Sequence, residues 1–460
     1  MRIKLDVLDE LLLLLDNEAT PLNVHCELRV DGTVDAVRLE AAIRTAMLRH
    51  PIARARLAPP RPLSRRYWWE IASDVGSIPL TVTDCADAVE LSNARERLLR
   101  ATPRLDSPGP FEVLLAHHPD GDAIILSFHH AAGDGATTFR FMSAIARAYA
   151  GEPDPLPDVD AVAARDVRSL IGRSARDRVR RGRGTTENVR RALAGPERMV
   201  LPAAGPPAGY GFDLFTLSTD DVAAARARGP AGATLNDVLL GGLAVAVRRW
   251  NDRRGGSPGP VYLMMPVNVR PAEWRSEVFG NFAPWIGVRV GPREQGDLRA
   301  ATAAAARRSG EIKARGLAGM LVDLWEPAYE LPVAIKRLIP PMLDRASRFT
   351  VDTAELSNMG HATGMPEAFG DAGEVTSFWW TPPGWPKLGA SFSAATFRSH
   401  LYIGLRYRKA VLDAAGAREL TQLYREALLG DRGASSAGDA GASPRGAKTS
   451  GSAAGSDVRA

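Results

Sequence analysis

The spacing of apolar residues divides most of the chain into strands and helices that follow one another. In the segment 24–30, apolar and polar residues alternate, which predicts a strand with one buried face and a solvent face that carries His25. In the segment 36–50, apolar residues recur at helical spacing up to Pro51, which predicts a helix that ends there. The chain is therefore expected to begin with a strand followed by a helix.

A hairpin and a helix come next. The apolar runs 111–116 and 123–128 have strand length, and the Pro-Asp-Gly between them is typical of a turn. Residues 136–150 carry apolar positions at helical spacing. The segment 128–135, Phe-His-His-Ala-Ala-Gly-Asp-Gly, thus connects the end of a strand to the start of a helix, where glycines permit tight backbone and catalytic groups commonly lie.

The second half of the chain repeats this alternation. The expected elements are strands at 212–218, 261–267, 280–290, 349–360 and 401–407, and helices at 234–250 and 413–429. The tryptophan-rich stretch 378–389 is expected to pack in a core, with the lining of a substrate pocket as the alternative.

Length and composition indicate an α/β protein of two comparable lobes. A chain of 460 residues is too long for one ordinary core. A Pro- and Asp-rich linker begins at residue 151, so we expect an N-terminal lobe over 1–155, a basic connection over 156–200 and a C-terminal lobe over 201–430. Residues 431–460 are rich in Gly, Ala and Ser and are expected to be disordered.

The connecting segment 128–135 carries the candidate chemistry. His129 and His130 are neighbours on an extended backbone, so their side chains point to opposite sides and at most one faces a given cleft. Imidazole titrates near neutral pH and can act as a general base. The residues alone leave open which histidine does so, and whether Asp134 orients the loop or an imidazole. A structural histidine pair on a buried turn is the alternative.

The motif His-His-x-x-x-Asp-Gly resembles the signature of the condensation-domain-like acyltransferases. This superfamily includes nonribosomal peptide condensation domains, wax ester synthase/diacylglycerol acyltransferases, polyketide-associated acyltransferases and, more distantly, chloramphenicol acetyltransferase. The resemblance implies two chloramphenicol-acetyltransferase-like lobes in a V with a central active-site tunnel. It implies a catalytic site of His129, His130, Asp134 and Gly135, in which His130 is the base, His129 packs and Asp134 pairs with an arginine of the other lobe.

Further passages resemble the same superfamily. The stretch 266-PVNVR-270 is similar to its Pro-Val-Asn-x-Arg passage, which implies Arg270 as the partner of Asp134. Asn281 matches its Gly-Asn strand and could form a hydrogen bond within the tunnel or turn the chain. Thr-Leu-Asn-Asp-Val at 234–238 implies a supporting role for Asn236 beside Asp237, although Asp237 and Thr234 also form a capping-box pattern.

Ser357 and Asn358 are the last supporting candidates. Residues at similar positions in the superfamily lie near the catalytic histidine and can polarise the thioester carbonyl, and such donors stabilise an oxyanion. A simple turn that closes the strand is the equal alternative.

Composition limits the compartment and the ligands. Two cysteines without metal spacing fit a reducing cytoplasm and no bound metal. The first residues do not read as a signal peptide, because acidic residues precede a short apolar run, and no apolar run reaches membrane-spanning length. We therefore expect a cytoplasmic protein without a transmembrane segment.

An arginine-dense stretch follows the linker. Residues 165–191 hold ten arginines against Asp166, Asp177 and Glu187. A solvated helix is one interpretation, and a surface for CoA phosphates, an acidic carrier protein or a lipid headgroup is the other. Nucleic acid fits less well, because aromatics and a nucleic-acid module are absent from the stretch. The broken apolar segment 317–345 predicts core or lid helices, with peripheral membrane contact as the less favoured possibility.

The expected function follows from the resemblance. It implies transfer of an acyl group from a thioester, either acyl-CoA or a carrier-protein phosphopantetheine, to an acceptor hydroxyl or amine in natural-product or lipid biosynthesis. No bound cofactor is expected, since the thioester is the donor substrate. The alternatives are a freestanding peptide-type condensation enzyme that forms an amide and a catalytically silent relative that binds a carrier protein.

Overall fold

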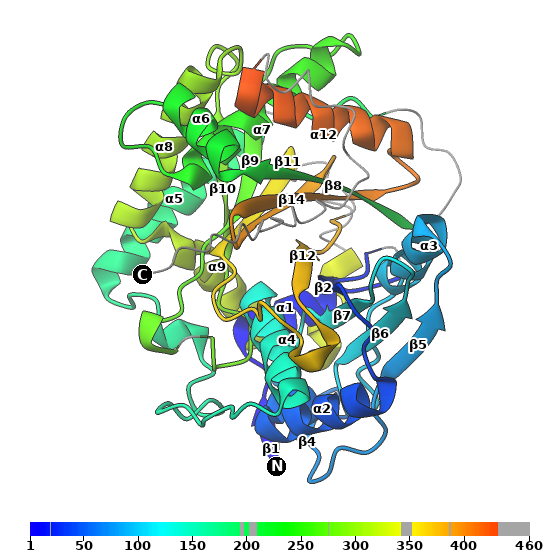
Figure 1. The fold of residues 1–460 in the computed structure, drawn as a ribbon. Coiled ribbons are helices and arrows are strands. Elements are labelled where there is room, and N and C mark those ends of the chain that lie inside the picture. The colour runs from blue at the N-terminus through cyan, green and yellow to red at the C-terminus, as the bar shows by residue number, and fades with distance from the viewer. Residues whose placement is uncertain are drawn as a thin grey trace, which may run out of the picture.

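The computed structural model describes most of the chain (Figure 1). The described residues are 1–18, 20–193, 197–201, 209–274, 276–341, 352–385 and 388–430. The tail expected to be disordered, 431–460, lies outside them, as do the first residues of the strand expected at 349–360. In Figure 1 the first half of the chain, in blue and cyan, forms most of the lower part, and the green-to-red second half forms most of the upper part.

The first sheet has five strands in the order β12-β2-β7-β6-β5. Its strands are β2 (Asn23–Val30), β5 (Leu80–Asp84), β6 (Phe111–His117), β7 (Ala123–His129) and β12 (Val375–Thr381). The predicted hairpin is confirmed, because β6 and β7 pair in antiparallel register. The helices α2 (Ala36–Arg49) and α4 (Gly135–Ala150) bury their apolar faces against one side of this sheet.

The prediction that His25 lies on a solvent face is wrong. The helix α3 (Ala88–Leu99) covers this side of the sheet, and its Arg95 pairs with Glu27 on β2. His25 is buried there. Polar residues that alternate along a strand predict an exposed face only when no other element covers that face.

The second sheet has six strands in the order β10-β9-β11-β13-β14-β8. Its strands are β8 (Tyr210–Ser218), β9 (Val261–Pro266), β10 (Trp285–Val290), β11 (Ala354–His361), β13 (Ser391–Phe397) and β14 (His400–Arg408). One face is covered by α7 (Leu235–Asp252), α8 (Leu298–Ala314) and α12 (Ala414–Leu429), which build a second hydrophobic core with it. The short helix α6 (Thr219–Arg228) follows β8.

The strand β12 joins the two halves. It belongs to the segment expected to form the C-terminal lobe, 201–430. It nevertheless pairs antiparallel with β2 in the first sheet, with Trp380 opposite Cys26. Phe378 and Trp380 enter the core beneath α2 and α4. The first sheet therefore contains a strand from outside residues 1–155, and the boundaries of the two lobes remain a prediction. Strand pairing joins residues far apart in the chain. The pattern of apolar residues in 378–389 therefore could not indicate which sheet this strand joins.

The remaining segments lie beside these sheets. The connection contains η2 (Val167–Ser169) and the helix α5 (Ala175–Leu193), so the arginine-dense stretch is partly helical, which both of its interpretations allow. The segment expected to form core or lid helices contains η4 (Leu317–Gly319), α9 (Met320–Tyr329) and α10 (Val333–Lys336). A third, small sheet has the order β1-β4-β3, with β1 (Arg2–Lys4), β3 (Ala55–Leu57) and β4 (Trp68–Ile71). The remaining described elements are α1 (Val7–Leu15), η1 (Pro51–Arg54), η3 (Ala272–Trp274) and η6 (Gly370–Ala372).

The fold is mixed α/β, as predicted. None of the helices that the structure describes combines the length and the apolarity that a bilayer crossing requires. The V and the central tunnel remain predictions.

Candidate active site

The motif loop lies where the sequence placed it. The strand β7 ends at His129, and α4 begins at Gly135 with Asp134 as its N-cap. A Cβ on Gly133 would lie 2.7 Å from Thr137 Cβ, so a side chain cannot be accommodated there without a shift. A Cβ on Gly135 would lie 3.1 Å from Met359 Sδ of β11, which shows that the second sheet approaches the motif at this point.

The structure holds the backbone of His130 from two sides. Its N–H donates to the carbonyl of Leu22 at 2.8 Å, and its carbonyl accepts from Asn281 Nδ2 at 2.8 Å. The ring nitrogen Nδ1 lies 3.2 Å from the carbonyl of Gly133. A carbonyl can only accept, so Nδ1 carries the proton and Nε2 keeps its lone pair. Nε2 forms no hydrogen bond with any described residue.

Burial sets the charge of His130. Desolvation lowers the pKa of its imidazole, and the negative charge of Asp134 and the Gly133 carbonyl offset only part of this effect. The ring is therefore neutral at neutral pH, which is the form that can take a proton.

His129 occupies a different environment. Its side chain is buried, and Nδ1 accepts a hydrogen bond from the Ala131 N–H at 3.1 Å. Nε2 therefore carries the proton and lies 3.6 Å from a carboxylate oxygen of Asp16. Both nitrogens of His129 have protein groups beside them, as expected for a packing residue.

Asp134 and Arg270 form a buried ion pair. Nη1 of Arg270 lies 2.6 Å from Oδ2 of Asp134, and Nη2 lies 2.8 Å from Oδ1. The backbone N–H groups of Thr137 and Phe282 add hydrogen bonds to the same carboxylate at 3.1 Å each. Burial raises the pKa of Asp134, but Arg270 and the two backbone N–H groups together outweigh this effect, so the net pKa is lowered and the carboxylate stays charged. The pairing implied by the resemblance is confirmed.

Asn281 links the motif to the start of the chain. It lies in the loop before β10, since that strand begins at Trp285 and not at 280 as predicted. Besides the His130 carbonyl, its Nδ2 donates to Asp9 Oδ1 at 2.9 Å, and Arg165 Nη2 binds Asp9 Oδ2 at 2.7 Å. Sequence reasoning missed Asp9 and Arg165. The local signal in the sequence was an acidic residue beside a run of leucines. The structure shows that this carboxylate is fully buried, which is unusual for aspartate.

Asn236 and Asn358 lie together, but away from the contacts of His130. Asn358 Nδ2 donates to Asn236 Oδ1 at 3.3 Å, and Asn236 Nδ2 lies 3.3 Å from Met265 Sδ. Asn358 therefore faces α7, on the same side of β11 as the core residue Leu356. Thr234 caps α7 in a capping box with Asp237, so the capping role of Asp237 is confirmed.

Ser357 lies on the opposite face of β11, because side chains alternate along a strand. Its hydroxyl forms no hydrogen bond with any described residue. Ser393 opposite it on β13 donates to the carbonyl of Trp380 at 2.6 Å, so this face of the second sheet meets β12. Ser357 therefore has a free donor on the side of the sheet that faces the first half of the chain.

Comparison with known proteins finds relatives in sequence and in structure. No protein-family model matches the chain. The protein Rv2305 of Mycobacterium tuberculosis strain H37Rv is 35% identical over 387 residues, which cover 83% of this chain and 88% of that protein. Its counterpart MT2362 in strain CDC 1551 matches equally. Both are described as uncharacterized.

Solved structures of the same fold are more distant in sequence. The first condensation domain of the CDA synthetase has a TM-score of 0.66 at 17% identity and covers 93% of this chain and 96% of its own. The trichothecene 15-O-acetyltransferase of Fusarium sporotrichioides has a TM-score of 0.65 at 11% identity over 93% and 95%. The starter condensation domain of rhizomide synthetase, in complex with C8-CoA and Leu-SNAC, has a TM-score of 0.63 at 15% identity over 93% and 94%.

Proposed function

Since the chain belongs to one family with Rv2305 and has the fold of the condensation-domain-like acyltransferase superfamily, we propose that it transfers an acyl group from a thioester to an acceptor hydroxyl or amine. The observation that carries the proposal is the tautomer of His130. Its Nδ1–H is committed to the Gly133 carbonyl, which leaves Nε2 as a neutral base. Acyl transfer needs such a base beside the attacking group.

The proton follows a simple path in this reaction. Nε2 of His130 takes the proton from the acceptor as its oxygen or nitrogen attacks the thioester carbonyl. The carbon–sulfur bond breaks when the tetrahedral intermediate collapses, and the protonated imidazole returns the proton to the leaving thiolate. The products are an ester or amide and a free thiol, and no bound cofactor takes part. Asp134, fixed by Arg270, positions the loop and does not exchange protons.

The intermediate needs a hydrogen-bond donor for its oxyanion. We assign this role to Ser357, because its hydroxyl has no hydrogen-bond partner in the described part of the chain and lies on the face of β11 that is directed to the first half of the chain. Asn358 is the second candidate, although its amide already binds Asn236. Ser357→Ala should lower kcat by on the order of 10²- to 10³-fold, as the loss of one oxyanion donor does in other enzymes, whereas Asn358→Ala should have a smaller effect.

The acyl donor in this proposal is acyl-CoA or a carrier-bound thioester, and the acyl acceptor is a hydroxyl or an amine. Among the structural neighbours, one forms a complex with C8-CoA and another is named an O-acetyltransferase. Acyl-CoA or a carrier-bound acyl group is therefore the donor class, and a hydroxyl is our preferred acceptor. An amine acceptor would make the protein a freestanding amide-forming condensation enzyme.

Thiol release tests the proposal. The purified protein is incubated with acyl-CoAs of different chain length, with acyl-pantetheine and with pooled alcohols and amines, and free thiol is followed. His130→Ala should slow acceptor-dependent release by on the order of 10²- to 10⁴-fold. The control His118→Ala alters a histidine in the polar turn after β6 and should leave the rate unchanged. Equal rates in wild type and His130→Ala would refute the role of His130.

A further inference from the structure

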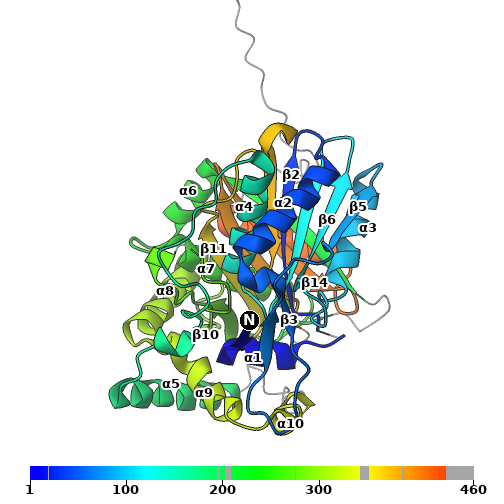
Figure 2. The same cartoon turned by 90° about the horizontal axis from the view of Figure 1, so that it is seen from below.

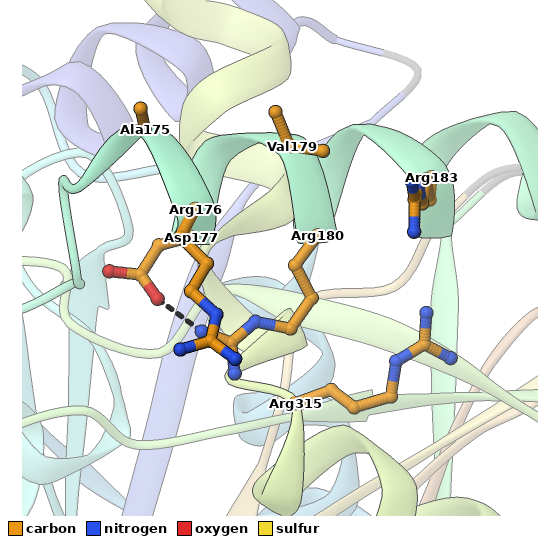
Figure 3. A pocket seen from close by; sticks show the side chains of 7 residues that line it. All are labelled: Ala175, Arg176, Asp177, Val179, Arg180, Arg183 and Arg315. Atoms are coloured by element: carbon orange, nitrogen blue, oxygen red, sulfur yellow. Dashed lines mark hydrogen bonds and ion pairs between the residues drawn. The ribbon is translucent and has the colours of Figure 1, made fainter.

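A groove lined by arginines lies between α5 and the C-terminal end of α8 (Figure 3). Its volume is about 920 Å³. The lining residues are Ala175, Arg176, Asp177, Val179, Arg180, Arg183 and Arg315. Arg176, Arg180 and Arg183 are spaced by four and three residues, so they share one face of α5, and Figure 3 shows them directed to the same side as Arg315.

The arginines of α5 whose side chains the structure describes divide into two sets. Those directed to α9 have carboxylate partners: Arg178 lies near Glu326, and Arg181 binds Asp323. In the groove, Arg180 pairs with Asp177. Arg176, Arg183 and Arg315 form no ion pair with any described residue. Among the described residues, the groove therefore has an excess of positive charge, and such an excess attracts an anionic partner.

Exposed aliphatic side chains accompany this charge. Val179 lies in the groove and is 57% exposed, and Leu324 on α9 and Leu338 just after α10 are each 63% exposed. Leu63 is also exposed, and its loop binds the start of α10, since Ala334 N–H donates to the Pro62 carbonyl at 3.0 Å. Figure 2 shows α5, α9 and α10 along one edge of the molecule.

We propose that this edge, formed by the arginine groove and the exposed aliphatic residues of α5, α9 and α10, binds the surface of a membrane that contains anionic phospholipid. The guanidinium groups would bind headgroup phosphates, for which arginine is well suited. Leu324 and Leu338 would enter the boundary of the acyl chains. Peripheral membrane binding requires both components, basic residues and apolar side chains on one surface.

Other anionic partners fit this edge less well. A free nucleotide such as CoA would be expected to use an aromatic or glycine-rich wall for its base and phosphates, and the residues that line the groove supply neither. An acidic protein would meet the positive charge, but it would leave the aliphatic residues that extend beyond the groove to Leu324 and Leu338 without a role.

The sequence could not show this surface. Membrane binding needs basic residues and apolar side chains together. The basic run 165–191 has little apolar area. The broken apolar segment 317–345 has no long basic face. The structure brings the two segments together, because α5 packs along α9 through the Arg181–Asp323 pair.

Vesicle cosedimentation tests the proposal without any need for catalysis, so its outcome is independent of the proposed acyl transfer. The full chain is incubated with vesicles of phosphatidylcholine alone or mixed with phosphatidylglycerol. Binding should require phosphatidylglycerol and weaken as salt is raised. The variant R176E/R183E/R315E should bind at least on the order of 100-fold more weakly, since each basic residue near an anionic surface contributes several-fold.

Matched variants separate the two components. L324S/L338S should lower the partition coefficient about tenfold or more, and V37S should not, because Val37 is an exposed residue of α2. The charge control R44E/R97E/R100E changes α2 and the end of α3, far from α5 in Figure 2, and should bind as wild type does. Equal binding to both vesicles, no binding to either, or equal loss in the two charge variants would overturn the proposal. Calorimetric binding of inorganic pyrophosphate without vesicle binding would do so too, since it would identify a site for soluble phosphates.

Discussion

Replacing Arg270 by leucine should destabilise the protein through the carboxylate that it leaves behind. Asp134 is bound by Nη1 and Nη2 of the guanidinium group, at 2.6 and 2.8 Å, and the side chains of Arg270 and Asp134 are only 3% and 5% exposed. The two backbone N–H groups that also bind this carboxylate would remain. Removal of one partner of such a buried pair costs about 3–5 kcal/mol, so this is the loss of unfolding free energy that we expect at pH 7.

The dependence on pH follows from the sign of the pKa shift. In the wild type Arg270 holds the pKa of Asp134 below its usual value, so the carboxylate contributes stability at all pH values above its unfolded pKa and loses it only as pH falls through the lower, folded pKa. Without Arg270, only the two backbone hydrogen bonds still oppose the effect of burial, so this pKa should rise. The variant therefore gains from protonation, and its deficit should shrink as pH falls from 7 to 5.

Urea unfolding followed by tryptophan fluorescence measures this deficit at both pH values. The control Arg248→Leu removes a more exposed pair with Asp252 on α7 and should cost at most about 0.5 kcal/mol. Adding Asp134→Asn to Arg270→Leu should restore part of the loss, because the buried charge is then removed. A deficit below about 1 kcal/mol at pH 7, or one that grows towards pH 5, would refute the reasoning.

Three further outcomes are expected. The kcat/KM of thiol release should fall on the acid side with a midpoint below about pH 6.5, because burial lowers the pKa of His130 and only the neutral ring accepts a proton; a midpoint above pH 7 would contradict this. Thr234→Ala removes the cap of α7 and should cost about 1 kcal/mol in thermal denaturation, and an unchanged Tm would disprove the capping contribution. Gly133→Ala should cost about 1–3 kcal/mol, because its Cβ would lie 2.7 Å from Thr137 Cβ, whereas Gly296→Ala meets nothing within 4 Å and should be neutral; equal Tm values would argue against the clash.

Local features were predicted from the sequence because their causes are local. The hairpin before the motif, the helix after it and the cap of α7 depend on residues within one or two turns of each other, so apolar spacing and capping chemistry were sufficient. The residues also showed that only one of the two adjacent histidines could face a given cleft. The choice of His130 over His129 came from the resemblance to the superfamily. The choice of Arg270 as the partner of Asp134 came from the same source.

Tertiary structure decided how these local elements combine, and it did so through contacts between residues far apart in the chain. β12 joins the first sheet, α3 covers the polar face of β2, and Asp9 reaches the His130 carbonyl through Asn281. The sequence alone determined that an imidazole lies at the end of a strand, and burial in the folded structure made it neutral. The fold decided which nitrogen is free, because it places the Gly133 carbonyl 3.2 Å from Nδ1, where it accepts the hydrogen bond of the Nδ1–H group.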